Sequence, residues 1–222
     1  MTVDVVVLDT ETTGINAQSE RIIEIGAIKL RENRPVSKFH TYVNPQGVRS
    51  QPGALAVHGI TDDFLLDKPD FTAIYPAMVD FITGCQLVIH NAPFDVGFLD
   101  AELARVGYQA HVADVCEVID TLLLARARFP GQKNNLDALC KRFGISNEHR
   151  TLHGALLDAD LLAKVYIQMC VDQSDLLGSE GKASVGQPRS VSAAWIAPIQ
   201  LVEATTEELD AHIEWMASLT SG

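Results

Sequence analysis

The chain has 222 residues, 47% of them apolar, and a formal net charge of −12. This length and apolar content predict one folded domain with residues to spare for an appendage, whereas the charge excludes a broad basic surface for duplex DNA, so that any contact with nucleic acid must be local. We predict a cytoplasmic protein that does not enter a membrane. The cysteines are isolated from one another, no signal-peptide pattern is present, and no apolar run approaches the roughly 18 residues needed to cross a bilayer.

The first part of the chain is predicted to contain strands in a meander. Residues 4–8 are a valine run suited to a buried strand, residues 21–30 are rich in isoleucine, and residues 38–43 complete the meander. A loop rich in proline and glycine follows. Residues 71–82 are then predicted to form a helix and residues 87–90 a strand.

The second part is predicted to alternate between strands and helices. Asn91 and Pro93 are good starting residues for a helix, and apolar side chains recur after them at helical spacing. The elements expected after this helix are a strand over residues 116–119 and helices over residues 122–127, 136–143 and 154–171. This order predicts an α/β fold in which helices flank a mixed five-stranded sheet.

The composition changes near the end of the predicted domain, which we expect to cover residues 1–172. Residues 173–192 are rich in serine and glycine and are predicted to form a flexible linker. Residues 193–222 regain apolar content, with Leu209 and Ile213 spaced for a short amphipathic helix. A segment this small is expected to need a partner protein.

Two acidic residues, Asp9 and Glu11, are predicted to lie at the end of the first strand. Because side chains alternate along a strand, both carboxylates face the same side of the sheet. The alternative is a polar strand end in water. Asp9 directly continues a buried valine run, where a carboxylate needs a cation or hydrogen-bond donors to compensate its burial.

Three further candidates come from later segments. Asp158 lies on the apolar stripe of its predicted helix, where a buried acid needs a partner; a salt bridge or a helix cap is the alternative. Asp95 lies in the first turn of a predicted helix, a position that the helix dipole alone can explain. His153 is expected in the loop or first turn that enters the helix of Asp158.

Four acids from three separate elements and one histidine fit phosphodiester hydrolysis assisted by two divalent cations. Mg²⁺ and Mn²⁺ prefer oxygen ligands, and two ions about 3.5 to 4 Å apart can stabilise the attacking and the leaving oxygen. One carboxylate must then bridge the two ions. A neutral histidine can take the proton of the attacking water, because its pKa lies near the operating pH.

These residues resemble the motifs of the DEDDh exonucleases, a family with an RNase H-like fold. The three motifs, in their expected order, read DTETTG from Asp9, HNAPFD from His90 and HGALLD from His153. The chain resembles most closely the epsilon proofreading subunits of bacterial DNA polymerase III. The segments that carry this closer resemblance are RIIEIGA at 21–27, HGI at 58–60, FLLDKP at 64–69, LDALC at 136–140 and RTLHGALLDA at 150–159.

The resemblance implies a role for each residue of the motifs. Asp9 would bridge two cations, Glu11 and Asp158 would help to bind the catalytic one, and Asp95 would hold the second through water. His153 would be the general base. The residues implied to line the pocket for the terminal nucleotide are Thr12, Val57, His58, Asn91 and Phe94. His58 and His90 can equally be ordinary polar groups near a strand or loop end.

The resemblance also implies a function and partners. The chain would be a 3′→5′ exonuclease that removes mispaired 3′-terminal nucleotides from DNA, acting on a single-stranded 3′ end. The tail at 193–222 would bind the polymerase alpha subunit, and a small theta-like subunit is a further expected partner. The peptide that resembles a sliding-clamp motif consists of Gln173, Ser174, Asp175, Leu176 and Leu177.

Two other functions remain open at this point. An RNA exonuclease of the RNase T or oligoribonuclease kind would use the same acids, so the motifs alone do not exclude it. A mainly structural adaptor between a polymerase and its clamp would depend on the tail and the clamp-like peptide instead. Catalysis and the adaptor role need not exclude each other, because they use separate segments.

Overall fold

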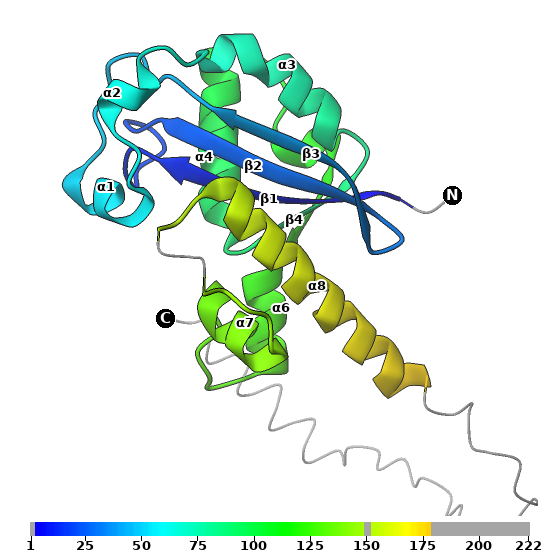
Figure 1. Cartoon of the computed structure of the whole chain (residues 1–222). Coiled ribbons are helices and arrows are strands. Elements are labelled where there is room, and N and C mark those ends of the chain that lie inside the picture. Colours follow the sequence, from blue (N-terminus) through cyan, green and yellow to red (C-terminus); the bar gives the residue numbers. More distant parts are fainter. Residues whose placement is uncertain (1–2, 149–151, 179–222) are drawn as a thin grey trace, which may run out of the picture. The chain divides into compact units, whose positions relative to one another are not determined.

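The computed structural model describes residues 3–148 and 152–178, with side chains to residue 170 (Figure 1). A five-stranded mixed sheet has the order β3-β2-β1-β4-β5, which confirms the predicted fold class. β1 is antiparallel to β2 and β2 to β3, whereas β4 is parallel to β1 and β5 to β4. The strands are β1 (Val5–Thr12), β2 (Ile22–Arg31), β3 (Arg34–Tyr42), β4 (Gln86–Ile89) and β5 (Glu117–Asp120).

The first strand is longer than its valine run predicted. β1 continues to Thr12, and Asp9 and Glu11 pair in register with Gly26 and Glu24 of β2. Pairing with β2 satisfies the backbone hydrogen bonds of these polar residues, so the strand does not end where its apolar residues end. Asp9 and Glu11 therefore belong to the last four residues of β1, which confirms that they lie at the end of the first strand.

The helices predicted from periodicity within the described residues are all present, whereas the short helix predicted in the tail lies outside them. The confirmed helices are α3 (Phe71–Ile82), α4 (Ala92–Arg105), α6 (Thr121–Arg128), α7 (Leu136–Phe143) and α8 (Ala155–Gly178). Three short helices lie in segments where no helix was predicted, namely α1 (Pro52–His58), α2 (Asp62–Leu65) and α5 (Val112–Val115). Their four to seven residues are too few to show a period, and α1 starts at a proline, which suits the first helical position.

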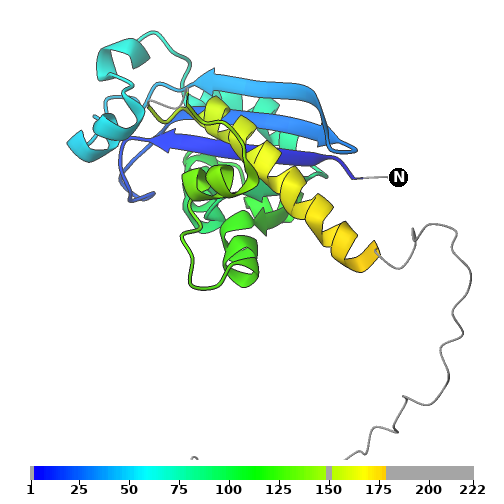
Figure 2. The ribbon, with the colours of Figure 1, turned by 60° about the horizontal axis from the view of Figure 1, so that its bottom comes forward.

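Helices cover both faces of the sheet, and the side chains of β1 point alternately into two hydrophobic cores. Val6 and Leu8 pack with α3 and α4 on one face, in a core that includes Phe71 and Phe98. Val7 packs on the other face with α7 and α8, in a core that includes Leu162. Figures 1 and 2 show α8 lying across β2 and β1, so its N-terminal turn reaches the polar half of β1.

The last helix extends beyond its predicted end. α8 continues to Gly178, so residues 173–177 belong to a helix instead of beginning a linker. No proline or glycine interrupts the sequence between Val171 and Gly178, and nothing in the backbone chemistry ends the helix earlier. The rest of the predicted linker and the tail at 193–222 lie outside the described residues. Within the described part of the chain, no helix has the length and apolarity to span a membrane.

Candidate active site

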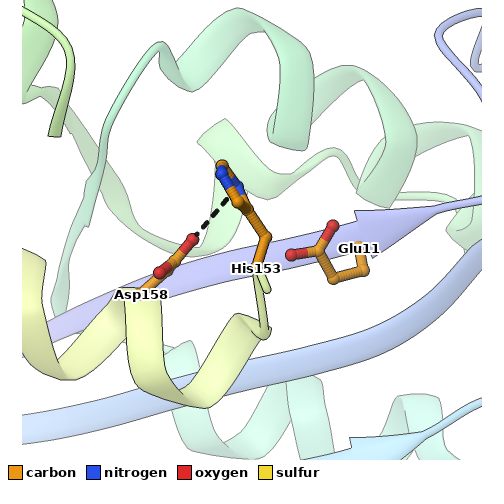
Figure 3. A group of neighbouring side chains, drawn as sticks. All are labelled: Glu11, His153 and Asp158. Atoms are coloured by element: carbon orange, nitrogen blue, oxygen red, sulfur yellow. Dashed lines mark ion pairs between the residues drawn. The ribbon is translucent and has the colours of Figure 1, made fainter. Parts of the chain in front are cut away.

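Glu11, His153 and Asp158 form a cluster where α8 meets β1. One ligand atom of each residue lies within 4.8 Å of the ligand atoms of the other two. Figure 3 shows the carboxylate of Glu11 pointing from β1 toward the side chains of His153 and Asp158. His153 comes from the loop before α8, and Asp158 comes from the first turn of this helix. Two carboxylates and an imidazole this close together are a suitable donor set for a divalent cation.

The burial of the three side chains differs. Glu11 is 8% exposed and Asp158 is 3% exposed. The side chain of His153 is 45% exposed, and its Nδ1 lies 3.5 Å from Oδ2 of Asp158. The reading of Glu11 as a polar strand end in water is therefore wrong, whereas His153 stands in the loop before α8 and can reach solvent as predicted.

Asp9 is the neighbour of Glu11 on the same face of β1. Its side chain is only partly buried, and its backbone pairs with Gly26. Alternation along the strand turns Asp9 and Glu11 to the face that α8 covers. The structure therefore brings Asp9 to the side of the sheet that carries the cluster.

Asp95 reaches the same stretch of β1 from the opposite face. The amide N–H and the hydroxyl of Thr10 donate to its Oδ1 at 3.1 and 2.7 Å. Asp95 is 4% exposed, and burial raises the pKa of its carboxyl group to about 7. The helix-dipole alternative accounts for its place in the first turn of α4, but does not explain why the side chain is buried against Thr10, between Asp9 and Glu11.

The N-terminus of α8 is held on the sheet by Glu24 and Gly26 of β2. Oε2 of Glu24 accepts a hydrogen bond from the amide of Ala155 at 3.1 Å, and Oε1 lies 2.8 Å from Nε2 of His40. A Cβ atom at Gly26 would lie 2.2 Å from the backbone nitrogen of Leu156, so only glycine permits this approach. Asp158, one turn further along α8, depends on both contacts for its position.

The loop that carries His153 is held from its other side by α1. The amide of His153 donates to the carbonyl of Val57 at 3.1 Å. Gln51, the residue before α1, anchors this helix to the end of β1, since its backbone N–H donates to the carbonyl of Thr13 at 2.7 Å. The short helix α1, which the sequence did not reveal, thus places Val57 and His58 beside the candidate base.

His58 is buried at the end of α1. Its Nδ1 accepts a hydrogen bond from the amide of Ile60 at 2.9 Å, so the ring proton lies on Nε2. Nε2 has no hydrogen-bond partner among the described residues. Burial lowers the pKa of His58, and the neutral ring therefore presents one unused donor.

The other predicted pocket residues lie near the ends of the strands. Thr12 is buried at the end of β1, and its hydroxyl donates to the carbonyl of Gly14 at 2.6 Å. Asn91 is exposed before α4 with a φ of 68°. Phe94 packs on Phe98 with ring centroids 5.0 Å apart. None of these three residues belongs to the cluster of Glu11, His153 and Asp158.

His90 has a structural contact. Its Nδ1 lies 2.9 Å from the hydroxyl of Thr121, at the start of α6, and burial lowers its pKa. This contact supports the reading of His90 as a polar group near a strand end.

Thr10 and Glu24 were not expected to have a role at the site. Thr10 looked like an ordinary strand residue, and Glu24 stands inside an isoleucine run. A buried acid inside an apolar strand is itself a signal that the side chain has a specific partner. The identity of that partner, the N-terminus of α8, depends on residues more than a hundred positions away.

Known proteins resemble this chain in sequence and in fold. The model of the exonuclease family matches residues 6–166. The DNA polymerase III subunit epsilon of Haemophilus influenzae is 43% identical over 227 residues, which cover 95% of this chain and 88% of that protein. The same subunit of Escherichia coli is 43% identical over 218 residues, covering 93% of this chain and 89% of the relative.

Two solved structures share the fold. Exonuclease X in complex with 5′-overhanging duplex DNA superposes with a TM-score of 0.60 at 28% identity, covering 77% of this chain and 93% of that one. Escherichia coli exonuclease I in complex with a dT13 oligonucleotide gives a TM-score of 0.65 at 21% identity, covering 81% of this chain and 43% of that one. The second likeness bears on the fold alone. With its acids on β1, α4 and α8, this chain belongs to the exonuclease family and, within it, to the DNA polymerase III epsilon subunits.

Proposed function

We propose that this chain is a proofreading 3′→5′ exonuclease that removes mispaired 3′-terminal nucleotides from DNA as a subunit of a replicative polymerase. The observation that carries the proposal is the cluster of Glu11, His153 and Asp158, in a chain whose relatives are epsilon subunits. The relatives support the assignment to replication, and the cluster supports the chemistry.

Two divalent cations, Mg²⁺ or Mn²⁺, are the proposed cofactors. Glu11 and Asp158 would hold one cation, Asp9 would contact both, and Asp95 would hold the second through water. The donor set fits hard cations because every proposed ligand is a carboxylate. When bound, the cations would lower the pKa of the attacking water and stabilise the charge on the phosphate and the leaving 3′ oxygen.

Side chains of the protein would transfer the proton, orient the base and bind the terminal nucleotide. His153 would take a proton from the attacking water, since its ring is exposed to solvent and lies beside both carboxylates. Asp158 would orient that ring. The buried N–H of His58 would donate to the terminal nucleotide, because it lacks a protein acceptor among the described residues and stands beside Val57.

The partner segments are proposed separately from catalysis. Residues 193–222 would bind the polymerase alpha subunit, and residues 173–177 would bind the sliding clamp. Because α8 reaches Gly178, clamp binding would require the last turns of this helix to open or to bind as a helix. A small theta-like subunit is a further proposed partner.

A degradation assay tests the activity. The purified chain is given Mg²⁺ or Mn²⁺ and a labelled single-stranded DNA with a mismatched 3′ end, and the expected products are nucleoside 5′-monophosphates. The variant Asp9→Ala should be nearly inactive. Undiminished activity in this variant, or no release of monophosphates by the original chain, would count decisively against the proposal.

A second pair of variants tests the role of His153. His153→Ala is expected to keep cation binding but to lose at least 99% of turnover, in line with typical losses of about 10² to 10⁴ for a general base. The matched control is His111→Ala, since His111 is also exposed and lies 3.3 Å from an acid, Asp100. Equal activity of the two variants would exclude His153 as the base.

The RNA exonuclease alternative shares the same acids. Rates on DNA and RNA oligonucleotides of one sequence separate the two functions, and the DNA rate is expected to be the higher one. A faster rate on RNA would favour the alternative.

A further inference from the structure

A polar pocket of about 460 Å³ lies at the start of α4, apart from the cluster of acids. We call it the loop pocket, because the segment between α6 and α7 forms much of its wall. Its polar lining residues are His90, Asn91, Arg126, Gln132, Asn134 and Asn135. None of the lining residues is acidic, and only Leu122 is apolar.

The loop pocket and the acids lie at the same end of the sheet, where the parallel strands finish. β1, β4 and β5 are parallel, so their carboxyl ends lie together. Glu11 is near the end of β1, whereas His90 and Asn91 directly follow β4. A strand of nucleic acid whose 3′ end is at the acids can therefore pass along this end of the sheet and over the loop pocket.

The charge of this region is opposite to that of the whole chain. Residues 126–142 contain five basic residues and one acid, although the formal net charge of the chain is −12. Arg126 and Lys133 are exposed and form no ion pair with any described residue. The carboxylate of Asp120 borders the pocket, but it accepts hydrogen bonds from the backbone amides of Asn91 and Leu122 at 3.1 and 2.8 Å. An unpaired guanidinium among lining residues that include no acid is well suited to a phosphate group.

The wall of the loop pocket is held in place by hydrogen bonds. Arg142 donates to Oδ1 of Asn134, to Oε1 of Gln132 and to the carbonyl of Lys133, at 3.1, 3.0 and 2.9 Å. Asn134 is 7% exposed and donates to the carbonyl of Phe129 at 3.1 Å. A preorganised loop loses little conformational entropy when a ligand binds.

Another surface pocket has the opposite character. The pocket beside α2 has a volume of about 500 Å³, and its charged lining residues are Arg49, Asp62 and Asp63. Two carboxylates beside a single arginine make this pocket less suited to a phosphate. The loop pocket therefore suits the backbone of a nucleic acid better.

We propose that the loop pocket binds a backbone phosphate of the substrate strand upstream of its 3′ end, with Arg126 as the principal contact and Lys133 as a second one. The proposal rests on the proposed nuclease function and adds to it a site for strand binding outside the acids. It gives an acidic chain the local positive contact that DNA binding requires.

The test compares a long substrate with a short one in the full chain. The long substrate is a single-stranded DNA of ten nucleotides, and the short one is the p-nitrophenyl ester of thymidine 5′-monophosphate, which has no upstream phosphate. Arg126→Gln should raise KM for the oligonucleotide about tenfold, the usual effect of one lost charged hydrogen bond, and leave hydrolysis of the ester unchanged. The matched control is Arg34→Gln, since Arg34 is also exposed but starts β3 at the far edge of the sheet.

Salt dependence provides a second readout. Each phosphate contact on a single strand contributes about −0.7 to the slope of log affinity against log salt concentration. The slope measured for Arg126→Gln should therefore be less negative by about 0.7. Arg126→Lys keeps the charge and should recover most of the lost binding. Urea unfolding midpoints equal to that of the original chain are expected, because the side chain of Arg126 is exposed and forms no hydrogen bond or ion pair with any described residue.

The outcomes separate the two proposals. Unchanged KM and salt slope for the oligonucleotide in Arg126→Gln would overturn the phosphate site, as would an equal loss on the ester. Failure of the original chain on both substrates would instead overturn the nuclease function. An equal effect of Arg34→Gln would show general charge attraction and not a site.

Discussion

At the scale of single residues, the buried carboxyl group of Asp95 links the site to stability. Its pKa of about 7 in the folded chain lies above the ordinary value of 3.8, so the folded state holds this proton to higher pH than the unfolded state does. Without cations, the free energy of unfolding must fall as the pH rises from about 4 to 7. A divalent cation at the proposed site would favour the charged form and oppose this loss.

The variant Asp95→Asn tests this linkage. The amide oxygen can still accept from Thr10, but the group no longer ionises. With a chelator present to remove cations, the variant should have a higher free energy of unfolding than the original chain. This difference should be greater at pH 8 than at pH 5.5, by an amount on the order of 2 kcal/mol. Urea unfolding at the two pH values measures the gain, and a gain independent of pH would contradict the account. The variant should also lose nuclease activity.

Glu24 shows how a residue without contact to substrate can set the geometry of a site. Replacing it with alanine leaves the amide of Ala155 without its acceptor at a buried position. We expect Glu24→Ala to lower the free energy of unfolding by about 1 to 3 kcal/mol and kcat at least tenfold, with little change in KM for the ester.

The conservative variant separates positioning from charge. Glu24→Gln keeps an acceptor for Ala155 and should retain most of kcat. Asp80→Ala, an exposed acid of α3, is the control and should change neither quantity. Equal losses in the alanine and glutamine variants of Glu24 would argue that its charge, and not its hydrogen bond, is what the site needs.

At the scale of elements, the approach of α8 to β2 decides where Asp158 and His153 lie. The approach is possible because Gly26 has no side chain at the point where α8 begins. Gly26→Ala should displace the helix start, lower the free energy of unfolding by about 3 kcal/mol and reduce activity at least 100-fold, since small misplacements of reacting groups are costly. Unfolding and ester hydrolysis measure the two effects.

A second glycine provides the control. Gly97 lies inside α4, and a Cβ atom there would meet nothing within 4 Å. Gly97→Ala should therefore stabilise the chain by up to about 1 kcal/mol, because alanine favours the helix. If both alanine variants behaved alike, helix propensity and not the approach of α8 would explain the result for Gly26.

At the scale of the whole molecule, the described domain and the remaining residues are expected to separate cleanly. The compact unit runs to Ser179, and the acids and His153 lie within it. A chain ending at Ser179 should keep nuclease activity on single-stranded DNA and lose binding to a polymerase subunit. Pull-down and degradation assays measure the two properties, and loss of activity on truncation would place part of the catalytic machinery in the tail.

The net charge acts at the same scale. A formal charge of −12 disfavours long-range attraction of DNA. We therefore expect DNA binding to depend on the cations proposed at the acids, on the contacts proposed at the loop pocket and on the proposed partner proteins. An epsilon-like subunit held at a polymerase would not need to search for DNA alone.

Much of the fold could be predicted because its signals are local. The valine run of β1, the isoleucines of β2 and the periodic stripe of α8 each reflect burial that neighbouring residues already show. The acids of the candidate site stood out for the same reason, since a carboxylate inside an apolar pattern is conspicuous. The short helices α1, α2 and α5 lacked enough residues for a period.

The sequence by itself determined the order of the strands and the longer helices, the sheet class and the acidic residues of the candidate site, because these follow from periodicity and from the cost of burying charge. Only the tertiary structure decided that Glu11, His153 and Asp158 meet, that Glu24 and Gly26 hold α8 against β2, and that Asp95 is buried on Thr10. These contacts join residues far apart in the chain. Their distances depend on how whole elements pack, and no local pattern of residues contains that information.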